Sequence, residues 1–119
     1  MLSSRPVAPD LLAVVQDYLE NDIAPRVPKV QQFQLKIVSR VLVTVQRELR
    51  QGPEAGAAEL RRLRALLGRE GSAADLNVAL ARAIREGDFV ADDPALLAHL
   101  RETMEAALRI NNPKWLTPQ

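Results

Sequence analysis

Residues 28–51 constrain the fold most, because apolar side chains cover more than half of this stretch when it is drawn as a helix. Its many β-branched residues favour a strand. Its polar residues, however, gather within roughly a 120° arc at helical spacing, whereas strand alternation would scatter them over both faces. We therefore predict a long helix whose apolar arc is covered by other helices on more than one side. The polar arc comprises Gln32, Lys36, Ser39, Arg40, Gln46, Arg47 and Arg50.

Four further segments carry apolar residues at helical spacing. They predict helices over residues 9–23, 54–67, 73–86 and 94–110. Few aromatic residues and many Ala, Leu and Arg residues also favour helix over sheet. At 119 residues the chain has the length of one domain. We therefore predict an all-α, single-domain bundle of about five helices with the second helix central, between a loose N-terminal arm (1–8) and a C-terminal tail (111–119).

Capping residues predict where these helices begin and end. Gly52 followed by Pro53 predicts a stop after the second helix and an immediate restart. Ser72, three residues before an aspartate, resembles a capping box. Asp92 or Asp93 is expected to cap the last helix, and Gly68 and Gly87 to end the third and fourth helices. Phe89 and Val90 are expected to tuck under the core from a short loop.

The composition argues against several classes of site. The chain has no cysteine and one histidine, which rules out disulfides, Cys-ligated zinc and a multi-histidine metal site within one chain. A net charge of +1 removes the general electrostatic argument for nucleic acid or an anionic membrane. Neither a signal sequence nor an apolar run of membrane-spanning length is apparent. We predict a cytoplasmic protein with no cofactor or metal and no nucleic-acid or membrane partner.

Catalytic motifs are not apparent either. The sequence has no Gly-rich phosphate loop, no G-x-S-x-G and no H-E-x-x-H. His99 lies at the edge of an apolar stripe with no nucleophile paired to it in sequence, so a boundary histidine with a wet edge is favoured over a catalytic base. The sequence therefore predicts a non-enzymatic protein without catalytic residues.

Four residues are candidate contacts for a partner or ligand. Glu48 falls on the apolar arc of the second helix, where a carboxylate is expected to be partly buried and paired. Arg61 and Arg64 belong to the densest basic patch, which is either a phosphate or acidic-partner clamp or the ordinary polar face of a helix. Trp115 lies in the tail, where it either anchors the terminus on its own core or docks a partner.

Three stretches resemble a bacterial family of small helical proteins of unknown function. They are Arg5-Pro6 leading into Asp10-Leu11-Leu12, then Phe33 to Leu49 ending in Arg47-Glu48-Leu49, and then Asp92-Asp93-Pro94-Ala95-Leu96-Leu97-Ala98-His99-Leu100-Arg101 with Asn112-Pro113-Lys114-Trp115. Relatives often carry a histidine and an asparagine in the second helix, where this chain has Gln34 and Arg40.

The resemblance implies a genomic context and no activity. Members of that family are commonly encoded beside aminoglycoside-phosphotransferase-like kinases and acyl-CoA dehydrogenases. Our leading hypothesis is a non-enzymatic accessory or protein-interaction module for such a kinase-like or acyl-CoA metabolic partner. The alternative is a helical bundle that binds a small molecule or an acyl chain in an enclosed pocket between the second and fifth helices. A homo-oligomer is also expected from the ample apolar content.

Overall fold

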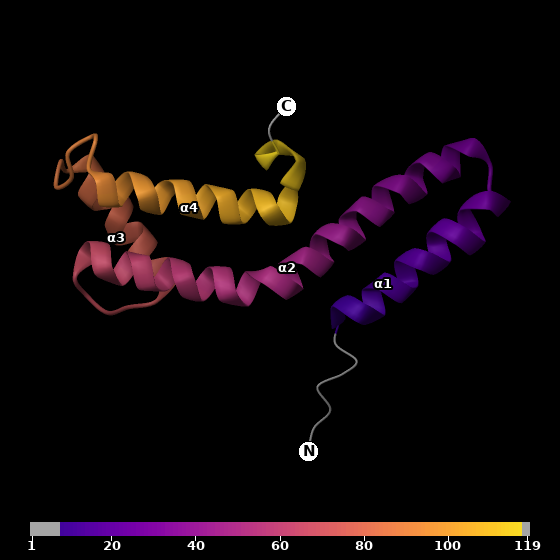
Figure 1. Cartoon of the computed structure of the whole chain (residues 1–119), viewed down its shortest axis with the longest axis horizontal. Coiled ribbons are helices and arrows are strands. Elements are labelled where there is room, and N and C mark those ends of the chain that lie inside the picture. Colours follow the sequence, from indigo (N-terminus) through magenta and orange to yellow (C-terminus); the bar gives the residue numbers. More distant parts are fainter. Residues whose placement is uncertain (1–7, 118–119) are drawn as a thin grey trace, which may run out of the picture. The chain divides into compact units, whose positions relative to one another are not determined.

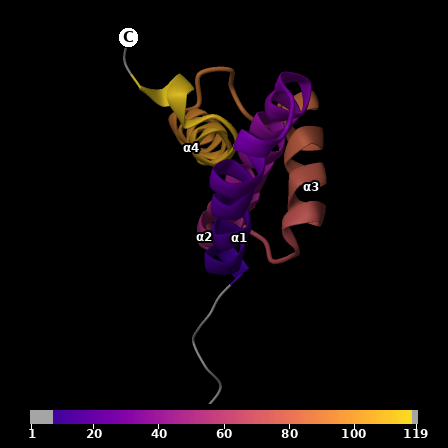
Figure 2. The ribbon, with the colours of Figure 1, turned by 90° about the vertical axis from the view of Figure 1, so that its right-hand side faces the viewer.

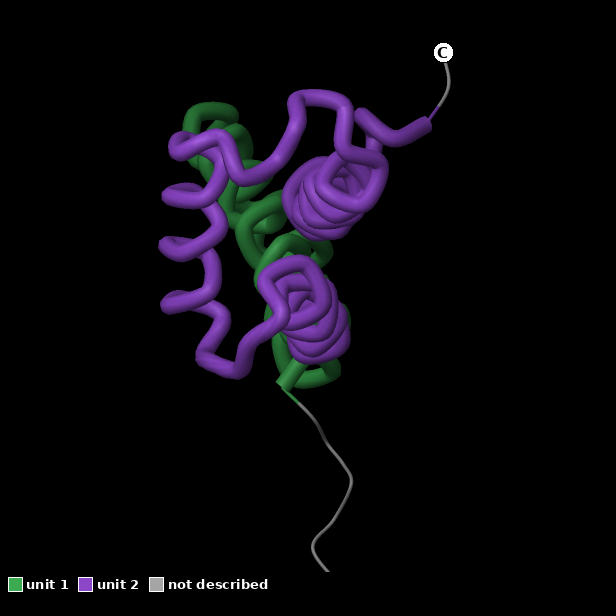
Figure 3. The backbone as a smooth tube through the Cα atoms, turned by 90° about the vertical axis from the view of Figure 1, so that its left-hand side faces the viewer, with its two compact units in different colours: residues 1–52 green, residues 53–119 purple. Residues whose placement is uncertain are grey.

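The computed structural model describes residues 8–117, and within them it contains four α-helices and no strand, which confirms the all-α class (Figure 1). Short π and 3-10 turns link the first two helices, and a 3-10 helix, Pro113–Leu116, follows the last. The chain divides into two compact units, unit 1 (residues 1–52) and unit 2 (residues 53–119) (Figure 3). The α-helices are α1 (Ala8–Tyr18), α2 (Lys29–Leu67), α3 (Ala73–Arg85) and α4 (Pro94–Asn111).

The predicted break at Gly52 and Pro53 is wrong, because α2 runs through both residues. A glycine stop needs a left-handed backbone, and the positive φ angles in the described chain belong to Gly68, Gly71 and Gly87 instead. Pro53 removes one helical hydrogen bond, but α2 continues past it through Glu54 and Ala55, which are good helix formers. The described residues therefore hold four α-helices where five were expected. The break signal coincides instead with the boundary between the two units.

The predicted caps of the last two helices are confirmed, whereas the first helix, predicted to reach residue 23, ends as an α-helix at Tyr18 and continues as a π-helix, Leu19–Ile23. The Ser72 Oγ accepts a hydrogen bond from the backbone N–H of Asp75 at 3.1 Å and caps α3. The Asp93 Oδ1 accepts from the N–H of Leu96 at 2.9 Å and caps α4. Gly87 has a φ of 79°, the left-handed value that ends a helix without steric cost. The first eight residues were predicted to be a loose arm; Ala8 already belongs to α1, and residues 1–7 lie outside the described part of the chain.

Unit 2 has an apolar core built by three helices. Leu63 of α2 and Leu76 of α3 are both 0% exposed, and Leu80 and Leu96 complete the buried cluster. Phe89 packs against this cluster from its loop, as predicted. Its neighbour Val90 stays exposed, which contradicts the prediction that both residues tuck inward.

In unit 2, residues 53–67 of α2 and helix α4 lie along similar directions, and α3 crosses both of them (Figures 2 and 3). Residues 53–67 of α2 and the whole of α4 are seen nearly end-on in Figure 3, whereas α3 lies across the view beside both of them (Figures 2 and 3). Within unit 2, α4 returns antiparallel to residues 53–67 (Figure 1). This arrangement brings the side chains of α4 onto the same side of α2 as Arg62 and Leu63.

Unit 1 is a helical hairpin of α1 and residues 29–52 of α2. The Gln46 Nε2 donates a hydrogen bond to the Gln16 Oε1 at 2.9 Å, and Arg50 lies 3.2 Å from Asp10 as an exposed ion pair. Later residues of α2 thus meet earlier residues of α1, which makes the pair antiparallel (Figure 1).

The most fully buried side chains of α2 in this hairpin are polar, contrary to the predicted burial of the apolar arc, and leucines such as Leu12 and Leu42 are only half-buried. Ser39 and Gln46, which belong to the predicted polar arc, are 6% and 7% exposed. Most of the apolar arc remains open to solvent, and Phe33 is 66% exposed. The reason is that α1 packs along the border between the polar and apolar arcs, so it covers only one edge of the apolar surface.

Truncating the core of unit 2 tests this packing. We expect Leu63→Ala to lower the free energy of unfolding by about 2–5 kcal/mol, because it removes buried methylene groups and leaves a cavity. Val78→Ala on the exposed side of α3 is the control and should change stability by less than about 0.5 kcal/mol. Urea denaturation followed by circular dichroism measures both. Equal losses in the two variants would contradict the assignment of the core.

Candidate functional site

A polar network joins α2 to α4 inside unit 2, and Arg62 is its centre. The Arg62 Nε donates a hydrogen bond to the Nδ1 of His99 at 3.0 Å. The Arg62 Nη2 donates to the Oγ1 of Thr103 at 2.9 Å. The Nη1 lies 3.3 Å from the Oε2 of Glu102, an ion pair whose carboxylate is more than half exposed. The planar guanidinium thus holds three side chains of α4 in one fixed arrangement.

His99 is buried within this network and is 3% exposed. Burial lowers the pKa of His99 below its ordinary value of 6.5, and the positive charge of Arg62 lowers this pKa further. The carboxylates of Glu59 and Glu102 act in the opposite direction and do not outweigh these effects. His99 is therefore neutral at pH 7. Because its Nδ1 accepts the hydrogen bond from Arg62, we assign its proton to Nε2.

The network has the properties of a structural link. A neutral histidine can act as a base, but the free electron pair of Nδ1 is already engaged by Arg62. The residues that touch Arg62 supply hydrogen bonds between two helices, which fixes how α4 lies against α2. In residues 8–117, no three or more histidine, aspartate or glutamate side chains come together as metal ligands.

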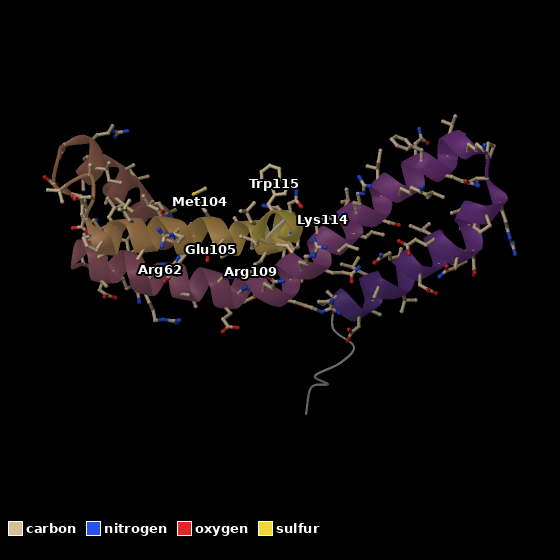
Figure 4. The ribbon with its side chains drawn as sticks, turned by 45° about the horizontal axis from the view of Figure 1, so that its top comes forward. Arg62, Met104, Glu105, Arg109, Lys114 and Trp115 are labelled. Carbon is tan, nitrogen blue, oxygen red and sulfur yellow. The ribbon has the colours of Figure 1, made fainter. Side chains whose placement is uncertain are left out.

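A second feature of unit 2 is an apolar surface along α4 that continues onto the 3-10 helix. Backbone hydrogen bonds order this helix, with the N–H of Trp115 donating to the carbonyl of Asn112 at 3.1 Å. Trp115 is 75% exposed, and Figure 4 shows its ring on the same side of α4 as Met104. We name this the tail surface. It consists of Leu97, Leu100, Met104, Trp115 and Leu116.

The structure separates the four candidate contacts that the sequence suggested. Glu48 is exposed, so the expectation that it is partly buried is wrong, because α1 packs on a different side of α2. Glu48 lies in unit 1, while Arg61, Arg64 and Trp115 lie in unit 2. Their roles in binding stay predictions.

The three arginines of the basic patch, Arg61, Arg62 and Arg64, have different surroundings in the structure. Arg61 is exposed, whereas Arg64 lies 3.4 Å from Glu70 in an ion pair. Arg62, between them, turns toward α4 and carries the network. Consecutive helical residues point about 100° apart, so Arg62 faces away from Arg61, and the binding roles of Arg61 and Arg64 stay predictions.

Sequence reasoning placed His99 at a wet boundary and did not single out Arg62 as its partner. A signal was present, since His99 follows the core residue Leu96 by three positions and so shares its face of α4. Arg62 directly precedes the core residue Leu63. Which residue of α2 meets His99 depends on the register between the two helices, which only the tertiary structure supplies.

This all-helical chain, in which the polar network around Arg62 joins α2 to α4, matches a family that has no assigned activity. The chain belongs to the family defined by the domain of unknown function DUF6285, whose model matches residues 25–115. The match spans part of both units. No curated protein and no solved structure is significantly similar to the chain. Among the helices of residues 8–117, none combines the length and apolarity that a membrane crossing needs.

The pKa of His99 can be followed directly, because the chain has one histidine. We expect its imidazole resonance to titrate below pH 6.5 in the folded protein. Near and below pH 6.5 the unfolded chain then binds more protons than the folded chain. The free energy of unfolding should therefore fall as the pH drops through 6.5 toward the folded pKa. Proton NMR and urea denaturation measure the two effects.

Replacing Arg62 distinguishes the two causes of the lowered pKa of His99, its own burial and the positive charge of Arg62. We expect Arg62→Met to raise the pKa of His99, because it removes the neighbouring positive charge and the hydrogen bond to Nδ1 while keeping an apolar stem. Arg61→Met is the matched control on the exposed side and should leave the titration unchanged. An unaltered midpoint in Arg62→Met would show that the charge of Arg62 does not act on His99.

Proposed function

We propose that this protein is a non-enzymatic accessory module that binds a partner protein through the tail surface. The observation that carries the proposal is the 75% exposure of Trp115 on a hydrogen-bonded 3-10 helix. A tryptophan that anchors its own terminus is buried, and this one is not. Tryptophan and methionine are enriched at protein interfaces, where a few such residues supply most of the binding energy.

The surroundings of Trp115 define the chemistry of the partner. Lys114 directly precedes it, whereas Arg109 and Glu105, an ion pair at 3.7 Å, lie on the other side of α4 from Met104 (Figure 4). A partner surface with an apolar pocket for the indole ring and a carboxylate near Lys114 would fit this pattern. The resemblance to a family encoded beside aminoglycoside-phosphotransferase-like kinases and acyl-CoA dehydrogenases makes those two cytoplasmic enzymes the partners to test first.

The alternative, an acyl-chain pocket between the second and last helices, receives less support from the described seam. Arg62 occupies that seam with hydrogen bonds to His99 and Thr103. An acyl chain placed there would leave these buried polar groups without partners, which costs free energy. Pocket binding therefore stays a prediction.

The single tryptophan of the chain allows a selective test. The full chain is labelled with 5-fluorotryptophan and titrated with an unlabelled aminoglycoside-phosphotransferase-like kinase or acyl-CoA dehydrogenase, the two classes that the family resemblance implies. We expect the one fluorine resonance to shift on binding. Trp115→Ala should weaken the affinity by about 2 kcal/mol or more, roughly 30-fold, as measured by calorimetry.

Val78→Ala is the control, because Val78 is similarly exposed but lies on α3. It should bind with unchanged affinity. If neither enzyme moves the fluorine resonance, or if Trp115→Ala binds as tightly as the unaltered chain, the tail surface is not the binding site for these partners.

A further inference from the structure

Unit 1 has no apolar core of its own among its described residues. The buried leucine cluster lies entirely in unit 2. In residues 8–52 the buried residues are Pro9, Ser39 and Gln46. Two helices whose leucines, such as Leu12 and Leu42, are only half-buried have little to stabilise them, since helices in proteins depend mainly on packing of an apolar face. The hairpin therefore needs a further layer.

The uncovered apolar residues of the hairpin form one face. Gln16 of α1 and Gln46 of α2 mark the seam, and the residue before each, Val15 and Val45, is exposed and apolar. Other residues that directly precede a seam residue are also exposed and apolar in both helices. Two antiparallel helices are related by an approximate twofold axis perpendicular to the plane that contains them. Residues that directly precede seam residues therefore lie on the same side of the pair in both helices. We name this the hairpin face. It consists of Leu11, Val15, Tyr18, Val38, Val41, Val45 and Leu49.

The opposite side of the hairpin has a different character. Several residues that follow seam positions are charged, with Asp17 and Glu20 on α1 and Arg40 and Arg47 on α2, although Ala13 and Val43 occupy equivalent positions. By the same geometry these residues lie on the side away from the hairpin face. The hairpin thus has one charged side and one side of valine, leucine and tyrosine, as an outer layer of a helical bundle does.

We propose that the hairpin face packs against the hairpin face of a second copy, so that two hairpins form a four-helix bundle. The hairpin face exposes roughly 600 Å² per copy, so two copies that face each other would bury about 1,200 Å² in total, the lower end of the range for a stable interface. A patch of roughly 600 Å² also lies at the upper end of the range of about 300–600 Å² found for the largest apolar patch of a monomer. An uncharged apolar face also matches itself, which suits an interface between identical subunits.

Light scattering on the full chain tests the proposal. The expected mass is twice the 13.2 kDa of one chain. The double variant Val38→Gln with Val45→Gln places two amides on the hairpin face and should have the mass of one chain. The control, Lys36→Gln with Arg40→Gln, introduces the same side chains on the charged side and should keep the doubled mass. A single-chain mass for the unaltered, helical protein would overturn the proposal.

A spin-label measurement does not depend on the folding of the double variant. Because the chain has no cysteine, Val41→Cys and Arg40→Cys each provide one labelling site, on the hairpin face and on the charged side. Electron double resonance should show a distance between the two copies, and that distance should be shorter for Val41→Cys. A shorter distance for Arg40→Cys would overturn the proposal. The tail surface lies in unit 2, so failure of this proposal leaves the partner-binding proposal intact.

Discussion

The structure depends on how the apolar surface of α2 is covered. In unit 2 the leucines of this helix lie against α3 and α4, and Leu63 is completely buried. In unit 1 a single helix packs on the same α-helix and covers one edge of its apolar arc. One helix cannot enclose an arc of that width, whereas two can, because each contact buries only a stripe. The difference between a closed core and an open hairpin follows from the number of helices available to each half of α2.

Polar contacts determine where the helices meet. The hydrogen bond between Gln16 and Gln46 lies in the hairpin seam, and Arg62 joins α4 to α2 through His99 and Thr103. A leucine can pack in many positions, but a buried amide or guanidinium must find its hydrogen-bond partners. Such contacts therefore select one register between helices that apolar packing would leave less well defined. The contact with Gln16 accounts for the burial of Gln46, which the helical pattern placed on an exposed polar arc.

Local signals predicted the helix ends well where a backbone conformation or a side-chain cap decides them. Ser72, Asp93 and Gly87 act as the sequence suggests, because capping involves residues within one turn. The same reasoning failed at Pro53. A proline is compatible with either a first turn or a helix interior, and the choice depends on the surrounding chain. The candidate site was predicted less well. His99 and the arginine patch were noted, but their pairing depends on contacts between residues 37 positions apart.

The amino-acid sequence by itself determined that the chain is helical, where most of its helices begin and end, and that residues 28–51 form an amphipathic helix, because these properties depend on periodicity and on neighbouring residues. Only the tertiary structure decided which side of that helix is covered. Its apolar arc offers several equivalent places for a neighbour, and the side-chain pattern does not distinguish among them. The position of α1 left Phe33 and the hairpin face open while it buried Ser39 and Gln46. A helix wheel can identify a face that needs a partner, but the register and polar contacts of the folded chain decide which part of it is left for another molecule.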